Sequence, residues 1–119
     1  MDKDELRKRT KVFAHECAKI AALFPENNLG FHIERQLIRC STSVAANYRA
    51  ALIAHSTAAF AAKLSIVIEE VDECGFWIEF AVDENLVSGE IVKPVIDEAS
   101  QLTAIYNASR KTIQSKNYK

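Results

Sequence analysis

The residues best suited to chemistry form two short polar groups on otherwise apolar segments. Positions 37, 40 and 44 form an apolar stripe at helical spacing, and continuing that stripe brings Asn47 onto the same face. A buried amide needs partners, because leaving it unsatisfied costs about 1–3 kcal/mol. Arg39 and Ser43 precede Asn47 on the same segment, and Glu70 and Glu73 stand beside the apolar stripe of a later segment.

These five residues predict a buried polar network between two helices. Glu70 or Glu73 would meet Asn47, Ser43 or Arg39 across the interface and fix the register of one helix against the other. A binding or catalytic site built from the same groups is the alternative hypothesis.

No motif of a catalytic or metal centre accompanies these groups in the sequence. The chain has no glycine-rich phosphate loop, no His-Glu-x-x-His, no Cys-x-x-Cys and no glycine-flanked serine. Di-iron bundles need Glu-x-x-His on two helices, and that spacing does not occur. The three histidines, His15, His32 and His55, also lack ligand spacing. We therefore expect no enzyme activity, no metal site and no cofactor.

The three cysteines, Cys17, Cys40 and Cys74, are widely spaced, and each lies within an apolar segment. This pattern indicates reduced thiols packed as small hydrophobic groups, which is typical of the cytoplasm. No apolar run approaches the roughly 18 residues of a spanning helix, and the first five residues are too charged for a signal peptide. We expect a cytoplasmic protein that does not enter a membrane.

Four segments with helical periodicity position these residues. Apolar residues recur every three or four positions, and we expect helices over residues 2–24, 29–54 or 31–54, 57–82, and 88–115 or 89–115. Pro25 ends the first helix, and Ser56 or Thr57 can cap the third. Pro94 predicts either that the fourth helix begins near Lys93 or that it is kinked.

Long helices with short breaks predict a single domain, residues 1–119, folded as an all-α, antiparallel up-down-up-down four-helix bundle. Three glycines and two prolines are too few turn formers for a β-sandwich or barrel. With 49% hydrophobic and 26% charged residues, the composition is that of a globular protein, and it excludes a disordered tail.

The net charge of −1 hides an uneven distribution of charge. Residues 1–11 hold five bases and three acids, whereas ten acids and one base lie between residues 69 and 98. In an up-down bundle the first helix begins, and the fourth ends, at the same pole, so basic residues gather there. A solvated surface is one interpretation. A docking surface for nucleic acid is the other, and its candidate contacts are Arg7, Lys8, Arg9, Lys11, Arg49, Arg110, Lys111 and Lys116.

The second and third helices carry more small and aromatic residues than one small bundle can bury. Residues 41–51 are rich in serine, threonine and alanine, and Phe76, Trp77 and Phe80 crowd the end of the third helix. Such surplus surface is typical of an oligomer interface.

Several of these segments together resemble a known family signature. They are Gln36-Leu37-Ile38-Arg39, Ser41-Thr42-Ser43-Val44-Ala45-Ala46-Asn47, Ser56, Phe60, Lys63-Leu64-Ser65-Ile66 and Glu70-x-x-Glu73-x-x-x-Trp77. Their order resembles that of the four-helix-bundle proteins of ribosomal RNA intervening sequences, over the second and third helices. Two positions depart from the family pattern: Arg49-Ala50 stands where relatives usually carry Glu-Ala or Glu-Gly, and Asp72 where many carry a base.

The resemblance implies a bundle that assembles into a ring-shaped homopentamer and has no established enzymatic activity. The family was first noticed in reading frames within insertions of large-subunit ribosomal RNA genes. A related branch, the accessory proteins of diversity-generating retroelements, forms similar pentamers that bind nucleic acid and a reverse transcriptase. Two hypotheses follow for this chain: a non-enzymatic oligomer associated with RNA or DNA, and a protein-interaction scaffold that does not bind nucleic acid.

Overall fold

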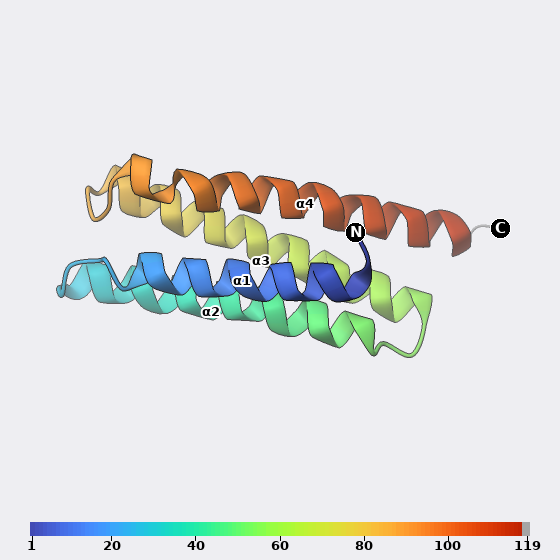
Figure 1. Cartoon of the computed structure of the whole chain (residues 1–119). Coiled ribbons are helices and arrows are strands. Elements are labelled where there is room, and N and C mark those ends of the chain that lie inside the picture. Colours follow the sequence, from blue (N-terminus) through green and yellow to red (C-terminus); the bar gives the residue numbers. More distant parts are fainter. Residues whose placement is uncertain (118–119) are drawn as a thin grey trace.

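Each helix follows a residue whose side chain accepts a hydrogen bond from the first turn. Asp2, Asn27 and Ser56 accept from the backbone N–H groups of residues 5, 30 and 59 at 2.8–3.0 Å. The Ser88 hydroxyl accepts from the backbone N–H of Ile91 at 3.2 Å. The computed structural model describes residues 1–117, with side chains described through Ser115. Its helices are α1 (Lys3–Ala21), α2 (Asn28–Leu52), α3 (Thr57–Asp83) and α4 (Gly89–Asn117) (Figure 1).

The four predicted helices are confirmed. α4 begins at Gly89, one of the two predicted starts, so Pro94 lies inside the helix and the alternative start near Lys93 does not occur. In the first turn of α4, Ile91 is 54% exposed, whereas Val92 is 4% exposed. Val92 is buried because it continues the three-and-four spacing of the buried residues at 95, 99 and 102.

Two turns depend on particular residue types. A Cβ atom at Gly30 would lie 2.0 Å from the carbonyl oxygen of Pro25, which is far inside van der Waals contact. The close approach of these two backbones therefore requires glycine. In the α3–α4 turn Asn85 adopts a φ of 59°, a left-handed conformation that asparagine tolerates better than most residues.

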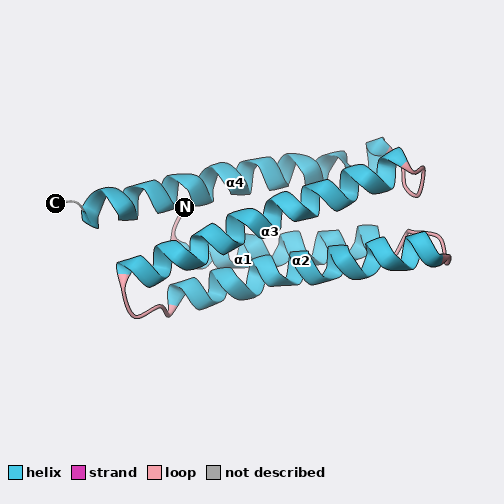
Figure 2. Cartoon of the chain, turned by 180° about the vertical axis from the view of Figure 1, so that it is seen from behind, coloured by secondary structure: helices cyan, strands magenta, loops and turns pink. Residues whose placement is uncertain are grey.

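Successive helices run in opposite directions, and helices adjacent in sequence are adjacent in space, which confirms the up-down-up-down bundle (Figures 1 and 2). The bundle measures 52 × 22 × 21 Å. α2 and α3 have the most extensive contact, whereas α1 and α4 touch sparsely. One end of the bundle holds the start of the chain, the α2–α3 turn and the end of α4 (Figure 1).

All four helices contribute side chains to one apolar core. Its largest wholly buried aliphatic members come from α2, α3 and α4, and they are Ile33, Leu37, Leu64, Ile78 and Leu102. Across residues 1–117, no helix is both long and apolar enough to cross a membrane.

Candidate functional site

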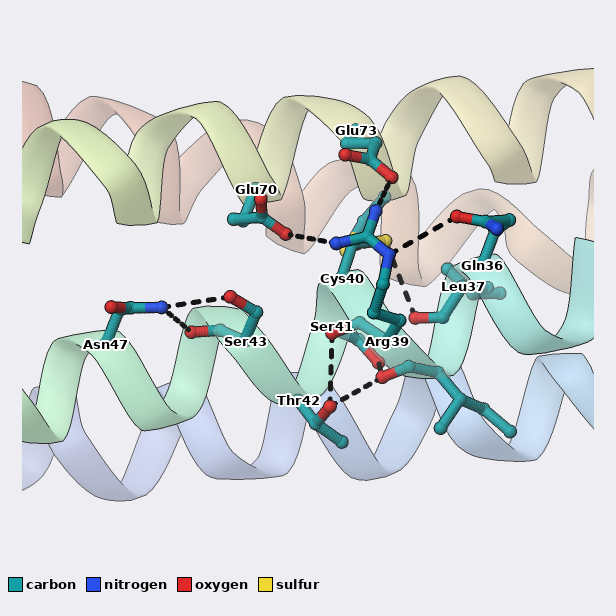
Figure 3. Close-up of polar contacts among 12 residues, drawn as sticks. Gln36, Leu37, Arg39, Cys40, Ser41, Thr42, Ser43, Asn47, Glu70 and Glu73 are labelled. Atoms are coloured by element: carbon teal, nitrogen blue, oxygen red, sulfur yellow. Dashed lines mark hydrogen bonds and ion pairs between the residues drawn. The ribbon is translucent and has the colours of Figure 1, made fainter.

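The Arg39 guanidinium on α2 bridges two carboxylates on α3 (Figure 3). Its Nη1 donates to Glu70 Oε2 at 3.3 Å, and its Nη2 donates to Glu73 Oε2. Its Nε donates to the side-chain oxygen of Gln36, one turn earlier on α2, at 3.3 Å. The side chain of Arg39 is about half exposed. The ion pairs therefore lie at the edge of the α2–α3 contact, where solvent reaches them, and not within the core.

Trp77 extends this group along α3. Its indole N–H donates to Glu73 Oε2 at 3.0 Å, and its ring packs edge-on against His32 of α2, with centroids 5.6 Å apart. Burial raises the pKa of Glu73, but hydrogen bonds from Trp77 and Arg39, together with the charge of Arg39, bring that pKa below its usual value. Glu73 is thus a fixed anion and a weak base.

Ser43 and Asn47 form a separate pair, so the five residues make two groups: Arg39 reaches Glu70 and Glu73 across the α2–α3 interface as predicted, and Ser43 and Asn47 do not. The Asn47 side-chain N–H donates to the carbonyl oxygen and to the hydroxyl of Ser43, both at 2.9 Å (Figure 3). Both residues belong to α2, four positions apart, so these bonds do not join two helices. Asn47 is only partly buried. Its own helix satisfies its donor one turn away, and it needs no partner on α3 for that purpose.

The three cysteines gather in the core from three different helices. Cys17, Cys40 and Cys74 are free thiols with no exposed surface, and the Sγ atoms of Cys40 and Cys74 lie 3.2 Å apart. Contact with the Cys74 thiol and burial raise the pKa of Cys40, and contact with the Cys17 thiol and burial raise the pKa of Cys74. Thiols in this state stay protonated and are weak nucleophiles. Sequence spacing placed each cysteine on an apolar stripe but did not show that they would meet.

A second polar group joins α1 to α4. Arg9 binds Glu98 through two parallel hydrogen bonds, from Nε to Oε2 at 2.7 Å and from Nη2 to Oε1 at 2.6 Å. Nearby, the Thr10 hydroxyl donates to the carbonyl oxygen of Leu6 at 2.7 Å and accepts from the Tyr106 hydroxyl. Arg9, one of the predicted phosphate contacts, is therefore engaged within the chain.

Other predicted phosphate contacts are also engaged. Arg7 and Lys8 pair with Asp4 at 2.9 and 3.1 Å. Arg110 donates to the Ser65 hydroxyl at 3.2 Å and to Asn107 at 2.9 Å.

Three predicted phosphate contacts, Lys11, Arg49 and Lys111, are exposed and form no ion pair with the described residues. The side chain of Lys116 lies outside the described part of the chain. Ion pairs with Asp4 on α1 thus lower the net positive charge of the basic pole that the residue counts predicted.

An aromatic cluster of Phe76, Trp77 and Phe80 lies on the surface of α3. Ring centroids within the cluster are 5.0–6.3 Å apart, and Phe76 and Phe80 are 52% and 36% exposed. Two isoleucines, Ile38 on α2 and Ile53 directly after its end, are also exposed, Ile53 by 77%. Among the residues whose side chains are described, no group of three histidine, cysteine or acidic residues is arranged to hold a metal ion.

Comparisons with known proteins agree with this architecture. The sequence model of the 23S rRNA-intervening sequence protein family matches residues 3–108. Among solved structures, a protein of unknown function from the S23 ribosomal protein family of Bacteroides thetaiotaomicron VPI-5482 aligns with a TM-score of 0.85 and 22% identity. The alignment covers 93% of this chain and 99% of that one. No curated protein gives a significant match.

Proposed function

We propose that this chain, which belongs to the 23S rRNA-intervening sequence protein family, assembles with copies of itself and acts by binding rather than by catalysis. The assembly is a homopentamer, the number that the family resemblance implies. The aromatic cluster of α3 carries the proposal. Exposing Phe76 and Phe80 to water is unfavourable in an isolated subunit, and covering them releases about 25 cal/mol per Å² of apolar surface.

The reactive side chains of the described residues support a binding role. The three thiols are buried, contact with a neighbouring thiol and burial raise the pKa of Cys40 and of Cys74, and Glu73 is held by Arg39 and Trp77. Such groups stabilise a structure but are poorly suited to attack a substrate or to transfer a proton. Free thiols also suit the reducing cytoplasm, where we place the protein.

Light scattering after size exclusion tests self-assembly. At micromolar concentration we expect a mass about five times the 13.3 kDa of one chain. Replacing Phe76 and Phe80 together by serine should reduce that mass while leaving helix content unchanged. Leu23→Ser is the matched control, because Leu23 is similarly exposed but lies outside the aromatic cluster. A wild-type mass of 13.3 kDa would overturn the proposal.

A second candidate function is association with nucleic acid through the assembled basic pole. The observation that favours it is the exposure of Lys11 and Lys111, which form no ion pair with the described residues. In a ring with cyclic symmetry, the same end of every subunit faces the same way, so these charges are multiplied by the number of subunits. They would bind a phosphate backbone without reading its sequence.

Filter binding of a labelled structured RNA at about 50 and 200 mM salt tests this candidate, since phosphate contacts weaken steeply over that range. Lys11→Gln/Lys111→Gln should weaken retention at the lower salt. The control, Lys19→Gln/Lys93→Gln, removes equal charge from lysines that already pair with acids. Retention that is absent, or indifferent to salt, would leave a scaffold that does not bind nucleic acid.

A further inference from the structure

The outward face of α3 carries acids that the subunit leaves unpaired. Glu70 and Glu73 bind Arg39, but Glu69, Asp72, Glu79 and Asp83 are exposed and form no ion pair with the described residues. These four carboxylates flank the exposed rings of Phe76 and Phe80 on the same helix. A surface that mixes apolar rings with uncompensated negative charge favours a partner that is apolar and basic.

A groove of about 550 Å³ runs beside this face, between α3 and α4. On α3 it is lined by Asp72, Gly75, Phe76 and Glu79, and on α4 by Ser100 and Thr103. A Cβ atom at Gly75 would meet no atom within 4 Å, so packing within the subunit does not require glycine there. Glycine inside a helix costs about 1 kcal/mol relative to alanine, and here it leaves room for a side chain from outside.

The outward face of α2 has the opposite character. It comprises six exposed residues at three-and-four spacing, Phe31, Arg35, Ile38, Thr42, Ala46 and Arg49, and the exposed C-cap residue Ile53 follows them. No acid occurs among them, and neither arginine forms an ion pair with the described residues. The small side chains of Thr42 and Ala46 at its centre allow another helix to approach closely. α2 therefore has a second amphipathic face, directed away from the core.

The charges on these two faces have matching spacing. Arg35 and Arg49 are fourteen positions apart, and Glu69 and Asp83 are also fourteen positions apart. At the rise of an α-helix both pairs are about 21 Å apart. One copy of α2 can thus bring both arginines to both acids of another copy at once. Thr42, midway between the arginines, then lies opposite position 76, next to Gly75, and in the antiparallel direction Ile38 lies opposite the exposed ring of Phe80.

We propose that the outward face of α2 in one subunit docks into the α3–α4 groove of the next subunit. This inference rests on the proposed self-assembly and names the surfaces that perform it. The two surfaces differ, so the contact is head-to-tail and repeats from subunit to subunit, as a closed ring requires. Arg49 is occupied in this contact, which leaves Lys11 and Lys111 for phosphate.

We test the contact by reversing the charges of the α3 face and of the α2 face separately, and then of both faces in one chain. Glu69→Lys/Asp83→Lys and Arg35→Glu/Arg49→Glu should each weaken assembly at least about tenfold, because like charges then face each other. The chain that carries all four substitutions should regain assembly, since every contact is again complementary. Glu26→Lys/Glu84→Lys is the matched control: it makes the same change in charge at exposed turn residues outside both faces.

A steric variant tests the groove without changing charge. Gly75→Leu should keep the helix content of the wild type and fail to assemble, whereas His15→Leu, which adds an exposed leucine on α1, should assemble normally. Suppose that the wild type is oligomeric and that Gly75→Leu and both double reversals are oligomeric too. The proposed docking of α2 into the α3–α4 groove is then wrong, but the proposed self-assembly is not. Loss of assembly in both double reversals without recovery in the fourfold variant would also overturn the docking. A monomeric wild type overturns both.

Discussion

The α2–α3 contact and the α1–α4 contact hold the same bundle together by different means. α2 and α3 meet along an extensive apolar surface, with the ion pairs of Arg39 confined to its exposed edge. α1 and α4 touch sparsely, and their contact includes the paired hydrogen bonds of Arg9 to Glu98 and the buried bond between Tyr106 and Thr10.

This difference shows that a polar bond contributes a different share of the stabilising free energy in the two contacts. Apolar burial is non-directional and is summed over many atoms, so an extensive contact tolerates the loss of an edge ion pair. In a sparse contact fewer atoms are buried, so each directional hydrogen bond supplies a larger share of the stabilising free energy. Substitutions should therefore cost most in the core of α2 and α3, and polar substitutions should cost more between α1 and α4 than between α2 and α3.

Ile33→Ala should have the largest effect, because Ile33 is a wholly buried side chain of α2. We expect the free energy of unfolding to fall by about 2–5 kcal/mol, the usual cost of such a truncation, and Ile33→Val to lose only about 0.5–1.5 kcal/mol. Urea denaturation at a fixed protein concentration measures both. A loss below about 1 kcal/mol for the alanine variant would show that the core of α2 is not the main source of stability.

Tyr106→Phe should have an intermediate effect, centred on the α1–α4 contact. It removes the hydroxyl that donates to Thr10, a bond worth about 1 kcal/mol. Tyr48→Phe is the matched control, since that hydroxyl forms no hydrogen bond with the described residues. Hydrogen exchange should accelerate in α1 and α4 more than in α2 and α3. Equal acceleration in all four helices would contradict the idea that this bond stabilises the α1–α4 contact in particular.

Glu73→Gln should have the smallest effect, and one that depends on pH. The pKa of Glu73 is lowered in the folded chain, so its ionised form contributes stability above the unfolded value of about 4.3. That contribution is lost as pH falls through the lower, folded pKa. Glu73 is about one third exposed, so we expect a difference below about 1 kcal/mol at pH 7 that vanishes in acid.

Thermal unfolding of both proteins from pH 7 to pH 3 measures this difference. Glu26→Gln, which removes an exposed carboxylate in the α1–α2 turn, should show no comparable pH dependence. A difference between wild type and Glu73→Gln that persists unchanged at pH 3 would show that the group acts through packing and not through charge.

The amino-acid sequence by itself determined the four helices, their direction and most of their core. Helical periodicity identified the buried face of each segment, and Ser56 is the N-cap of α3 as expected. These features are local, because a helix is defined by contacts between residues three or four positions apart. The tight Pro25–Gly30 approach depends on glycine, but the sequence did not reveal that requirement.

Only the tertiary structure decided which polar groups meet. Thr10 and Tyr106 are 96 residues apart, and Arg9 and Glu98 are 89 apart, so their pairing depends on how α1 and α4 are rotated and aligned. The rotation of α2 against α3 likewise decided that Arg39 reaches Glu70 and Glu73 while Asn47 bonds within α2. A change of helix phase by one residue moves a side chain about 100° around the axis. Sequence spacing fixes the buried face to within that angle, and the choice of partner at its edge depends on the packing of the whole bundle.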